Sequence, residues 1–294
     1  MPNVSANNID IEYEEFGEVS KPSVLLVMGL GMQMVGWPRD FCQMIADKGF
    51  HVVRFDNRDT GLSSHFHQAG MPNMLAIGTA LMSGTKPDSC YYLSDMGNDA
   101  AALLDALDIE KAHVVGASMG GMIAQELAIN HPQRMLSMTS IMSTTGRADL
   151  PKASPAAMEV LMSRPTGDDE ESLLDHAFKS QQTISGSKYP PVKVDVDART
   201  RESMARNIDA AGVARQMAAI AASGDRVAGL AEVDIPTLVI HGSEDPLVPV
   251  TGGEDTARCI ANAKLEIIDG WGHTLPRVLW QRIADMIGGH IAAV

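Results

Sequence analysis

Short, continuous apolar runs recur along the chain and predict buried strands. Most of these runs do not alternate with polar residues, which is typical of strands that are covered on both faces. The predicted strands are Ser23–Met28, His51–Phe55, Ala112–Gly116, Met135–Met142, Thr237–His241 and Lys264–Ile268.

Segments with helical patterns separate these strands. Pro38–Gly49 has a proline near its start and a glycine at its end, as helices often do. Leu93–Asp108 is rich in alanine and leucine, and Ser94 is its predicted N-cap. Met119–Pro132 ends at its proline. The alternation of strands and helices predicts an α/β fold with a mostly parallel central sheet and helices on both faces.

The alternation stops after Ile141 and resumes at Thr237. Between them the pattern is helical, and we expect a helical cap at 146–224 inserted into a core formed by 1–145 and 225–294. A separate helical domain is the alternative, which is less favoured because strands continue on both sides. The helices expected in the cap are Pro155–Ser163, Asp168–Thr183, Asp195–Asn207 and Ala211–Ser223.

Length and charge limit the class of partner. A chain of 294 residues with 45% hydrophobic residues can bury one sizeable core and carry an insertion. The formal net charge of −14 repels phosphate backbones and anionic membranes. We therefore expect a small-molecule partner, with neither nucleic-acid binding nor membrane insertion, and the sequence leaves a homodimer open.

The cysteines and the N-terminal residues predict a cytoplasmic location. Cys42, Cys90 and Cys259 form no CxxC pair, and three cysteines cannot all pair within one chain, so we expect buried free thiols. The first residues lack the basic and apolar segments of a signal peptide. No apolar run reaches the roughly 18 residues that a membrane span needs.

The first candidate for chemistry is a glycine-flanked serine. Gly116-Ala117-Ser118-Met119-Gly120 fits the pattern G-x-S-x-G, and it lies between a predicted strand and a predicted helix. A tight strand-to-helix turn needs glycines where a side chain would collide with a neighbouring element. The pattern predicts that Ser118 is a nucleophile; an ordinary glycine turn is the alternative.

A serine nucleophile needs a base, and His273 is the best of the nine histidines. It lies in "DGWGHTLP", directly after the strand Lys264–Ile268. That loop leaves the carboxyl edge of the sheet, where Ser118 also lies and where open α/β sheets bind ligands. His241, at the end of another strand, is the weaker alternative.

The acid that orients the base should follow another strand. "HGSEDPLVP" follows Thr237–His241 and contains both Glu244 and Asp245. We predict Asp245, because the next residue is a proline that stiffens the turn and because an aspartate is short enough for a fixed bond to an imidazole. Glu244 is the alternative.

Backbone N–H groups can form the oxyanion hole. Met119 begins the helix after Ser118, where N–H groups have no helical acceptor. Leu30 lies between Gly29 and Gly31 in the loop after the first predicted strand, where a glycine pair lets backbone N–H groups face a bound carbonyl. We predict the N–H groups of Leu30 and Met119 as donors; for the Leu30 loop an ordinary glycine turn is the alternative.

With these residues in place, the chain resembles the α/β-hydrolase superfamily over nearly its full length. The order Ser118, Asp245, His273 is that superfamily's order. "FDNRDTGLSS" (55–64) and "LLVMGLGMQMVGWP" (25–38) are similar to the aclacinomycin methylesterase-like group of carboxylic ester hydrolases. Met28 departs from the wider superfamily, which often has histidine before the oxyanion glycine. The resemblance implies ester cleavage.

These residues together predict a carboxylesterase mechanism. Ser118 attacks the ester carbonyl while His273 takes its proton, and water later cleaves the acyl-enzyme. Asp245 orients the imidazole, and the mechanism requires no metal or organic cofactor. The alternatives are an acyltransferase or C–C bond hydrolase of the same fold, or a ligand-sensing protein that retains the three residues.

The methionines favour small to medium apolar esters as substrates. The chain has 19 methionines but only 3 Trp, 4 Tyr and 6 Phe, and methionine fills irregular apolar space. Ordinary core filling is the alternative. The methionines expected near the pocket mouth or the cap are Met28, Met32, Met34, Met71, Met74, Met82, Met158 and Met162.

Overall fold

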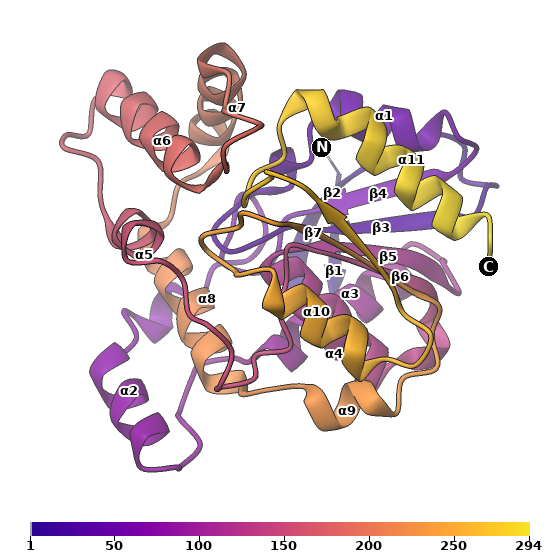
Figure 1. Cartoon of the computed structure of the whole chain (residues 1–294), viewed down its shortest axis with the longest axis horizontal. Helices are drawn as coiled ribbons and strands as arrows, with labels where there is room; N and C mark the ends of the chain where they lie inside the picture. Colours follow the sequence, from indigo (N-terminus) through magenta and orange to yellow (C-terminus); the bar gives the residue numbers. More distant parts are fainter. Residues whose placement is uncertain (1) are drawn as a thin grey trace.

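An eight-stranded sheet forms the centre of the computed structural model, which describes residues 2–294. The strands are β1 (Asn3–Ala6), β2 (Ile9–Phe16), β3 (Ser23–Val27), β4 (His51–Phe55), β5 (Ala112–Ala117), β6 (Met135–Ile141), β7 (Thr237–Gly242) and β8 (Lys264–Ile268). They lie in the order β1-β2-β4-β3-β5-β6-β7-β8 (Figure 1). β3 to β8 are parallel, and β1 and β2 pair antiparallel at one edge. All six predicted strands are present, each ending within one residue of its expected end. The prediction that they are buried is wrong for β8, an edge strand in which only Ile268 is buried.

The edge strands β1 and β2 were not predicted. In β2 buried and exposed residues alternate over part of the strand: Ile9 and Ile11 are buried, whereas Asp10 between them is exposed. Such alternation is expected for a strand with one solvated face. The segment therefore lacks the continuous apolar run that marks the other strands.

Helices cover both faces of the sheet (Figure 1). One face carries α1 (Arg39–Ala46) and α11 (Trp280–Ile291), which contact each other. The other face carries α3 (Leu93–Ala106), α4 (Met119–Asn130), α9 (Val227–Ala231) and α10 (Thr251–Cys259). Short 3-10 turns complete the core at η1 (Met34–Gly36), η2 (His67–Ala69), η3 (Pro132–Arg134) and η4 (Arg277–Leu279).

The predicted cap of α3 is wrong. The helix begins at Leu93, so Ser94 lies inside its first turn. Asp95 reaches back instead, and its carboxylate accepts a hydrogen bond of 2.7 Å from the N–H of Tyr92. An acidic side chain at the third helical position commonly pairs with the backbone before the helix in this way.

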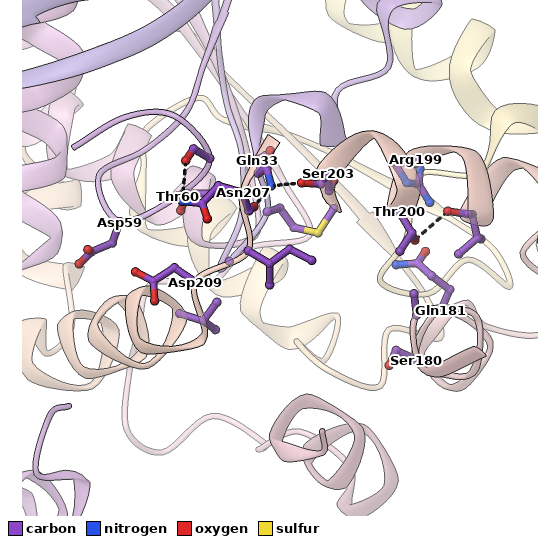
Figure 2. Close-up of a pocket in the computed structure, with 17 residues that line it drawn as sticks. Gln33, Asp59, Thr60, Ser180, Gln181, Arg199, Thr200, Ser203, Asn207 and Asp209 are labelled. Carbon is purple, nitrogen blue, oxygen red and sulfur yellow. Dashed lines mark hydrogen bonds between the residues drawn. The ribbon is translucent and has the colours of Figure 1, made fainter. Parts of the chain in front are cut away.

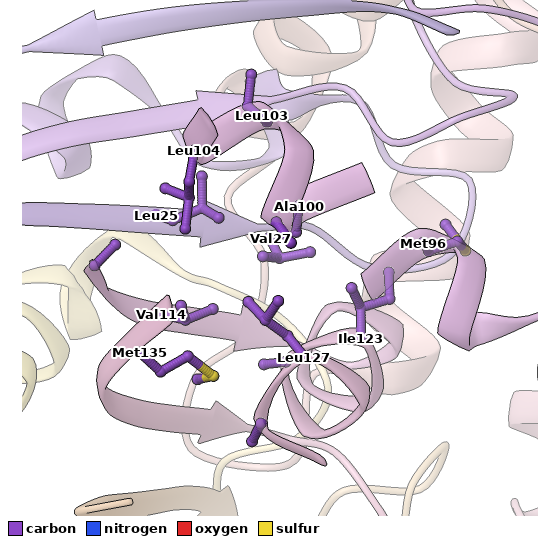
Figure 3. Packing of buried hydrophobic residues seen from close by; sticks show 14 of the residues in the cluster. Leu25, Val27, Met96, Ala100, Leu103, Leu104, Val114, Ile123, Leu127 and Met135 are labelled. Atoms are coloured by element: carbon purple, nitrogen blue, oxygen red, sulfur yellow. The ribbon is translucent and has the colours of Figure 1, made fainter. Parts of the chain in front are cut away.

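The core consists of two apolar layers, one on each face of the sheet. Leu25 and Val27 of β3 pack with α3 and α4, as Figure 3 shows. Val24 and Leu26 of the same strand pack on the opposite face with residues of α1 and α11. Successive side chains of a strand point to opposite faces, so a strand covered twice must be apolar throughout.

Residues 146–224 contain four helices and no strand, as far as the structure describes them. They are α5 (Pro155–Met162), α6 (Glu170–Ile184), α7 (Lys193–Arg206) and α8 (Ala210–Ser223). α5, α6 and α7 project beyond the sheet, while α8 lies nearer to it (Figure 1). We call 146–224 the cap region. Its division from a core at 1–145 and 225–294 stays a prediction.

A further helix outside the cap region, α2 (Met74–Met82), contacts α8. Among residues 2–294, none of the helices combines the length and apolarity needed to cross a bilayer. The cysteines are free thiols, but only Cys42 is fully buried, and Cys90 is exposed, contrary to the prediction of buried thiols.

Candidate active site

Ser118 lies on a strained turn between β5 and α4. Its backbone angles are φ 55° and ψ −119°, a conformation that side-chain-bearing residues rarely adopt. Both flanking positions must be glycine, because backbone oxygen atoms lie too close to each of them for a side chain to fit. A Cβ on Gly120 would lie 2.0 Å from the carbonyl oxygen of Val27, and one on Gly116 would lie 2.1 Å from the oxygen of Gly120. The turn therefore holds the hydroxyl at the carboxyl edge of the sheet.

The three side chains predicted as catalytic meet at this edge. The Ser118 Oγ lies 2.9 Å from the His273 Nε2, and the His273 Nδ1 lies 2.6 Å from the Asp245 Oδ2. Asp245 follows β7 and His273 follows β8, so adjacent parallel strands deliver both to the same place. Both residues are buried, with 5% and 8% of their surface exposed.

Asp245 is fixed and kept ionised by its surroundings. Its Oδ1 accepts hydrogen bonds from the N–H groups of Leu247 and Val248, at 2.9 and 2.8 Å. Burial by itself would raise the pKa of Asp245, but the charge of His273 and hydrogen bonds from His241 and His273 outweigh burial. The pKa of this carboxyl therefore lies well below its ordinary value.

The sequence predicts His241 only as the weaker candidate for the base, and it predicts no contact with the acid. The His241 Nε2 lies 3.5 Å from the Asp245 Oδ2 and 2.8 Å from the carbonyl oxygen of Val248. Its side chain thus sits behind the acid, away from the serine. The signal that could have found it is its position at the end of β7, four residues before Asp245.

The alternative acid, Glu244, points to a different partner. It is exposed, and its carboxylate accepts hydrogen bonds from the N–H and the hydroxyl of Ser187, at 2.7 and 2.9 Å. Ser187 belongs to the loop between α6 and α7 in the cap region. Glu244 therefore joins the cap region to the core, and Asp245 is the acid next to the imidazole.

The two predicted oxyanion donors line the same cavity as Ser118. Among residues 2–294 we find no loop, turn or side-chain acceptor for the N–H of Leu30 or of Met119. The adjacent Gly29 lies close to the nucleophile, because a Cβ there would lie 3.1 Å from the Cβ of Ser118. Both N–H groups are therefore free to bind a carbonyl oxygen, and their catalytic role stays a prediction.

A cavity of about 340 Å³ opens at the serine. Of the eight methionines expected near the pocket mouth or the cap, Met28, Met32 and Met158 line this cavity. Met162 does not line it but lies on α5 in the cap region, as expected. The other four lie outside the cavity wall and outside the cap region; Met34 is packed in the core, and Met71, Met74 and Met82 are exposed. Three methionines that were not singled out line the cavity as well, namely Met119, Met122 and Met142.

The cap region contacts the loop that carries His273. The N–H of Gly272 donates to the carbonyl oxygen of Ser185 at 2.9 Å. A Cβ on Gly272 would lie 2.2 Å from the carbonyl oxygen of Ile184, so the end of α6 packs directly against this loop. The cap region also supplies Gln181 and Arg199 to the cavity wall. No sequence signal marked these contributions.

One cluster of side chains has the composition of a metal site. Ligand atoms of His65, His67 and Asp209 lie within 4.8 Å of one another. However, the Asp209 Oδ2 already pairs with the guanidinium of Arg215 at 3.1 Å and with the His65 Nδ1 at 2.9 Å. The second nitrogen of His65 lies 3.0 Å from the carbonyl oxygen of Gly61 and 3.0 Å from the side-chain amide nitrogen of Asn207, so it can hydrogen-bond with either one. A carboxylate that is neutralised by arginine is a poor cation ligand, so these groups form a hydrogen-bonded junction.

Comparison with known proteins identifies the family. A model described as alpha/beta hydrolase fold matches residues 22–276. The chain belongs to the α/β-hydrolase family. Rhodomycin D methylesterase DauP from Streptomyces sp. (strain C5) is 28% identical, with 99% of this chain and 97% of the relative covered.

Two further relatives agree with this family. 3-Oxoadipate enol-lactonase 2 from Acinetobacter baylyi is 26% identical, with 90% of this chain and 87% of the relative covered. The meta-cleavage product hydrolase CumD from Pseudomonas fluorescens IP01 is similar in structure, with a TM-score of 0.73 and 18% identity, covering 100% of this chain and 98% of the other. At this identity CumD supports the α/β-hydrolase fold alone.

Proposed function

We propose that this α/β-hydrolase cleaves carboxylic esters with Ser118 as nucleophile, His273 as general base and Asp245 as orienting acid. The observation that carries the proposal is the continuous row of hydrogen bonds, 2.9 Å from Ser118 to His273 and 2.6 Å from His273 to Asp245. A serine hydroxyl becomes a strong nucleophile when an oriented imidazole accepts its proton. A methylesterase and an enol-lactonase among the relatives support an ester bond as the target.

The reaction has two steps. Ser118 adds to the ester carbonyl and its proton moves to the Nε2 of His273, while the N–H groups of Leu30 and Met119 stabilise the oxyanion. The alcohol leaves with that proton. Water then loses a proton to His273 and attacks the acyl-enzyme, which releases the acid and restores the serine. Ionised Asp245 stabilises the imidazolium in both steps.

The cavity supports small to medium esters with an apolar part. Its volume of about 340 Å³ lies at the small end of ligand pockets. Flexible methionine side chains such as Met28, Met122 and Met142 line the region around the serine. We therefore expect turnover to be fastest for short and medium acyl chains.

A panel of chromogenic esters tests this function. Wild-type protein should hydrolyse acetate to octanoate esters of p-nitrophenol, and Ser118→Ala should lower kcat by about 10⁴-fold or more. Ser5→Ala, on the exposed edge strand β1, is the matched control and should keep wild-type rates. Equal rates in wild type and Ser118→Ala would refute the nucleophile. Product analysis in the presence of methanol separates hydrolysis from acyl transfer.

A further inference from the structure

The active-site cavity adjoins a second cavity, which lies between the core and the cap region. This second cavity measures about 290 Å³ (Figure 2). Met32, Gln181 and Arg199 line both cavities, so they form the boundary between the two. Gln181 lies on α6 and Arg199 on α7. A substrate that is attacked by Ser118 can therefore reach these two polar side chains.

Arg199 has no partner of its own at this boundary. Among residues 2–294 its guanidinium forms no ion pair with a carboxylate and no hydrogen bond, and the side-chain amide of Gln181 forms none either. Asp195, one turn earlier on α7, acts on Arg199 only through space. Burial lowers the pKa of Arg199, yet an arginine stays charged in proteins. A half-buried cation thus lines the cavity with no contacting carboxylate.

Two neighbouring arginines, Arg206 and Arg215, are neutralised by ion pairs. Arg206 forms an ion pair with Asp56. Arg215 pairs with Asp59 at 2.7 Å and with Asp209 at 3.1 Å. Figure 2 shows Asp59 and Asp209 at the end of the second cavity opposite to Arg199. The acids of this cavity are therefore already paired, and the charge of Arg199 is left for a ligand.

Because a partly buried charge costs free energy unless it is paired, an unpaired guanidinium in a substrate cavity indicates an anionic ligand. Its planar set of N–H donors matches a carboxylate, and the amide of Gln181 adds a further donor. The net charge of −14 gives the protein no general attraction for anions, so an anionic substrate needs such a local cation.

We propose that the substrate is an ester that also carries a carboxylate, and that Arg199, with Gln181, binds this carboxylate while Ser118 attacks the ester. The inference rests on the proposed esterase function and specifies its substrate class. The part of the substrate that carries the carboxylate extends from Ser118 toward the second cavity. Neutral esters of the same size are poorer substrates because they leave the guanidinium unpaired.

Matched pairs of esters test the proposal. Methyl half-esters of straight-chain dicarboxylic acids are compared with the corresponding methyl ester amides, which have the same shape and no charge. Butyrate esters of ω-hydroxy acids and of their amides cover a carboxylate on the alcohol side. At the best chain length, wild type should favour the charged ester by about 10- to 100-fold in kcat/KM, mainly through KM.

Substitution of the arginine should abolish this preference. In Arg199→Met the ratio of kcat/KM for the charged and the neutral ester should fall to about one, and Arg199→Lys should restore part of it. Arg201→Met is the matched control. It removes one positive charge from the same helix, but Arg201 is exposed and paired with Glu170. It should keep the wild-type ratio.

Either of two results overturns the proposal: a ratio near one in wild type at every length, or an unchanged ratio in Arg199→Met. Calorimetric binding of the half-ester and of its amide to Ser118→Ala separates this failure from failure of the esterase function. Selective half-ester binding that Arg199→Met abolishes, without hydrolysis by wild type, would support the carboxylate site and refute the esterase. Hydrolysis by wild type with no preference for the charged ester would support the esterase function and refute the carboxylate site.

Discussion

The loop that carries Ser118 and the loop that carries His273 are held by different parts of the molecule. Ser118 is positioned by core backbone, because Gly120 packs against the carbonyl oxygen of Val27 in β3. The loop of His273 is held by β8 on one side and by the end of α6, through Ser185 and Ile184, on the other. The core alone thus fixes the nucleophile, whereas the base also depends on the cap region.

The adjacent acids Glu244 and Asp245 give the sharpest test of this difference, because one faces the cap region and the other faces the imidazole. Asp245→Asn should lower kcat by about 10⁴-fold, since the imidazole loses both its orientation and the charge that stabilises its protonated form. Glu244→Gln removes only the charge of an exposed contact to Ser187 and should change kcat by less than about threefold. Ester hydrolysis assays measure both. If Glu244→Gln lost more kcat than Asp245→Asn, Glu244 rather than Asp245 would be the acid that orients His273.

Truncation of buried leucines compares the stability of the two regions. Leu104 on α3 is fully buried in the core, and Leu104→Ala should lower the free energy of unfolding by about 3–4 kcal/mol. Leu174 on α6 is 6% exposed and is the only buried side chain of its helix. Leu174→Ala should therefore cost less, about 1–2 kcal/mol. Urea unfolding gives both values. Equal losses of unfolding free energy would contradict the expectation that the cap region is less stable than the core.

The dependence of His273 on the cap region can be broken at Gly272. In Gly272→Ala the new Cβ meets the carbonyl oxygen of Ile184, so α6 or the His273 loop must shift. A shift of about 1 Å at the base should lower kcat by about 10- to 100-fold. Gly289→Ala on α11, where a Cβ meets nothing within 4 Å, is the control and should retain kcat. Wild-type kcat in Gly272→Ala would show that the cap region does not position the base.

The sequence was most informative about the core and least informative about the cap region. Continuous apolar runs mark strands that are covered twice, and the turn at Ser118 needs glycines for reasons that a short motif records. The proline after Asp245 separated this acid from Glu244, and the structure places Asp245 beside His273. These inferences depend on local backbone geometry, which neighbouring residues specify.

Arg199 and Gln181 could not be found in this way. Helical periodicity indicates that α6 and α7 exist, but not which of their polar residues face a cavity that the core completes. Whether an arginine is paired also depends on contacts that are distant in sequence, such as Arg215 with Asp59. β1 and β2 were not predicted for a simpler reason, because neither contains a continuous apolar run.

A change of pH should affect the core without acting through the cap region. His113 of β5 is buried, its Nδ1 lies 2.8 Å from the Ser137 Oγ, and its ring packs against Phe50. Burial, together with the charge of His290, lowers the pKa of His113 from 6.5 to about 4. Between these two values the unfolded chain binds more protons than the folded one, so acidification destabilises the fold.

The unfolding free energy of wild type should therefore fall as the pH drops from about 6.5 to about 4, and level off for this group below about 4. His113→Gln keeps a polar partner for Ser137 but does not titrate in this range, so it should lose less stability than wild type over the same interval, by up to about 3 kcal/mol. Urea unfolding at several pH values measures the difference. Parallel pH profiles for the two proteins would mean that the acid sensitivity arises elsewhere, and His290, whose pKa burial also lowers from 6.5, would be the next group to test.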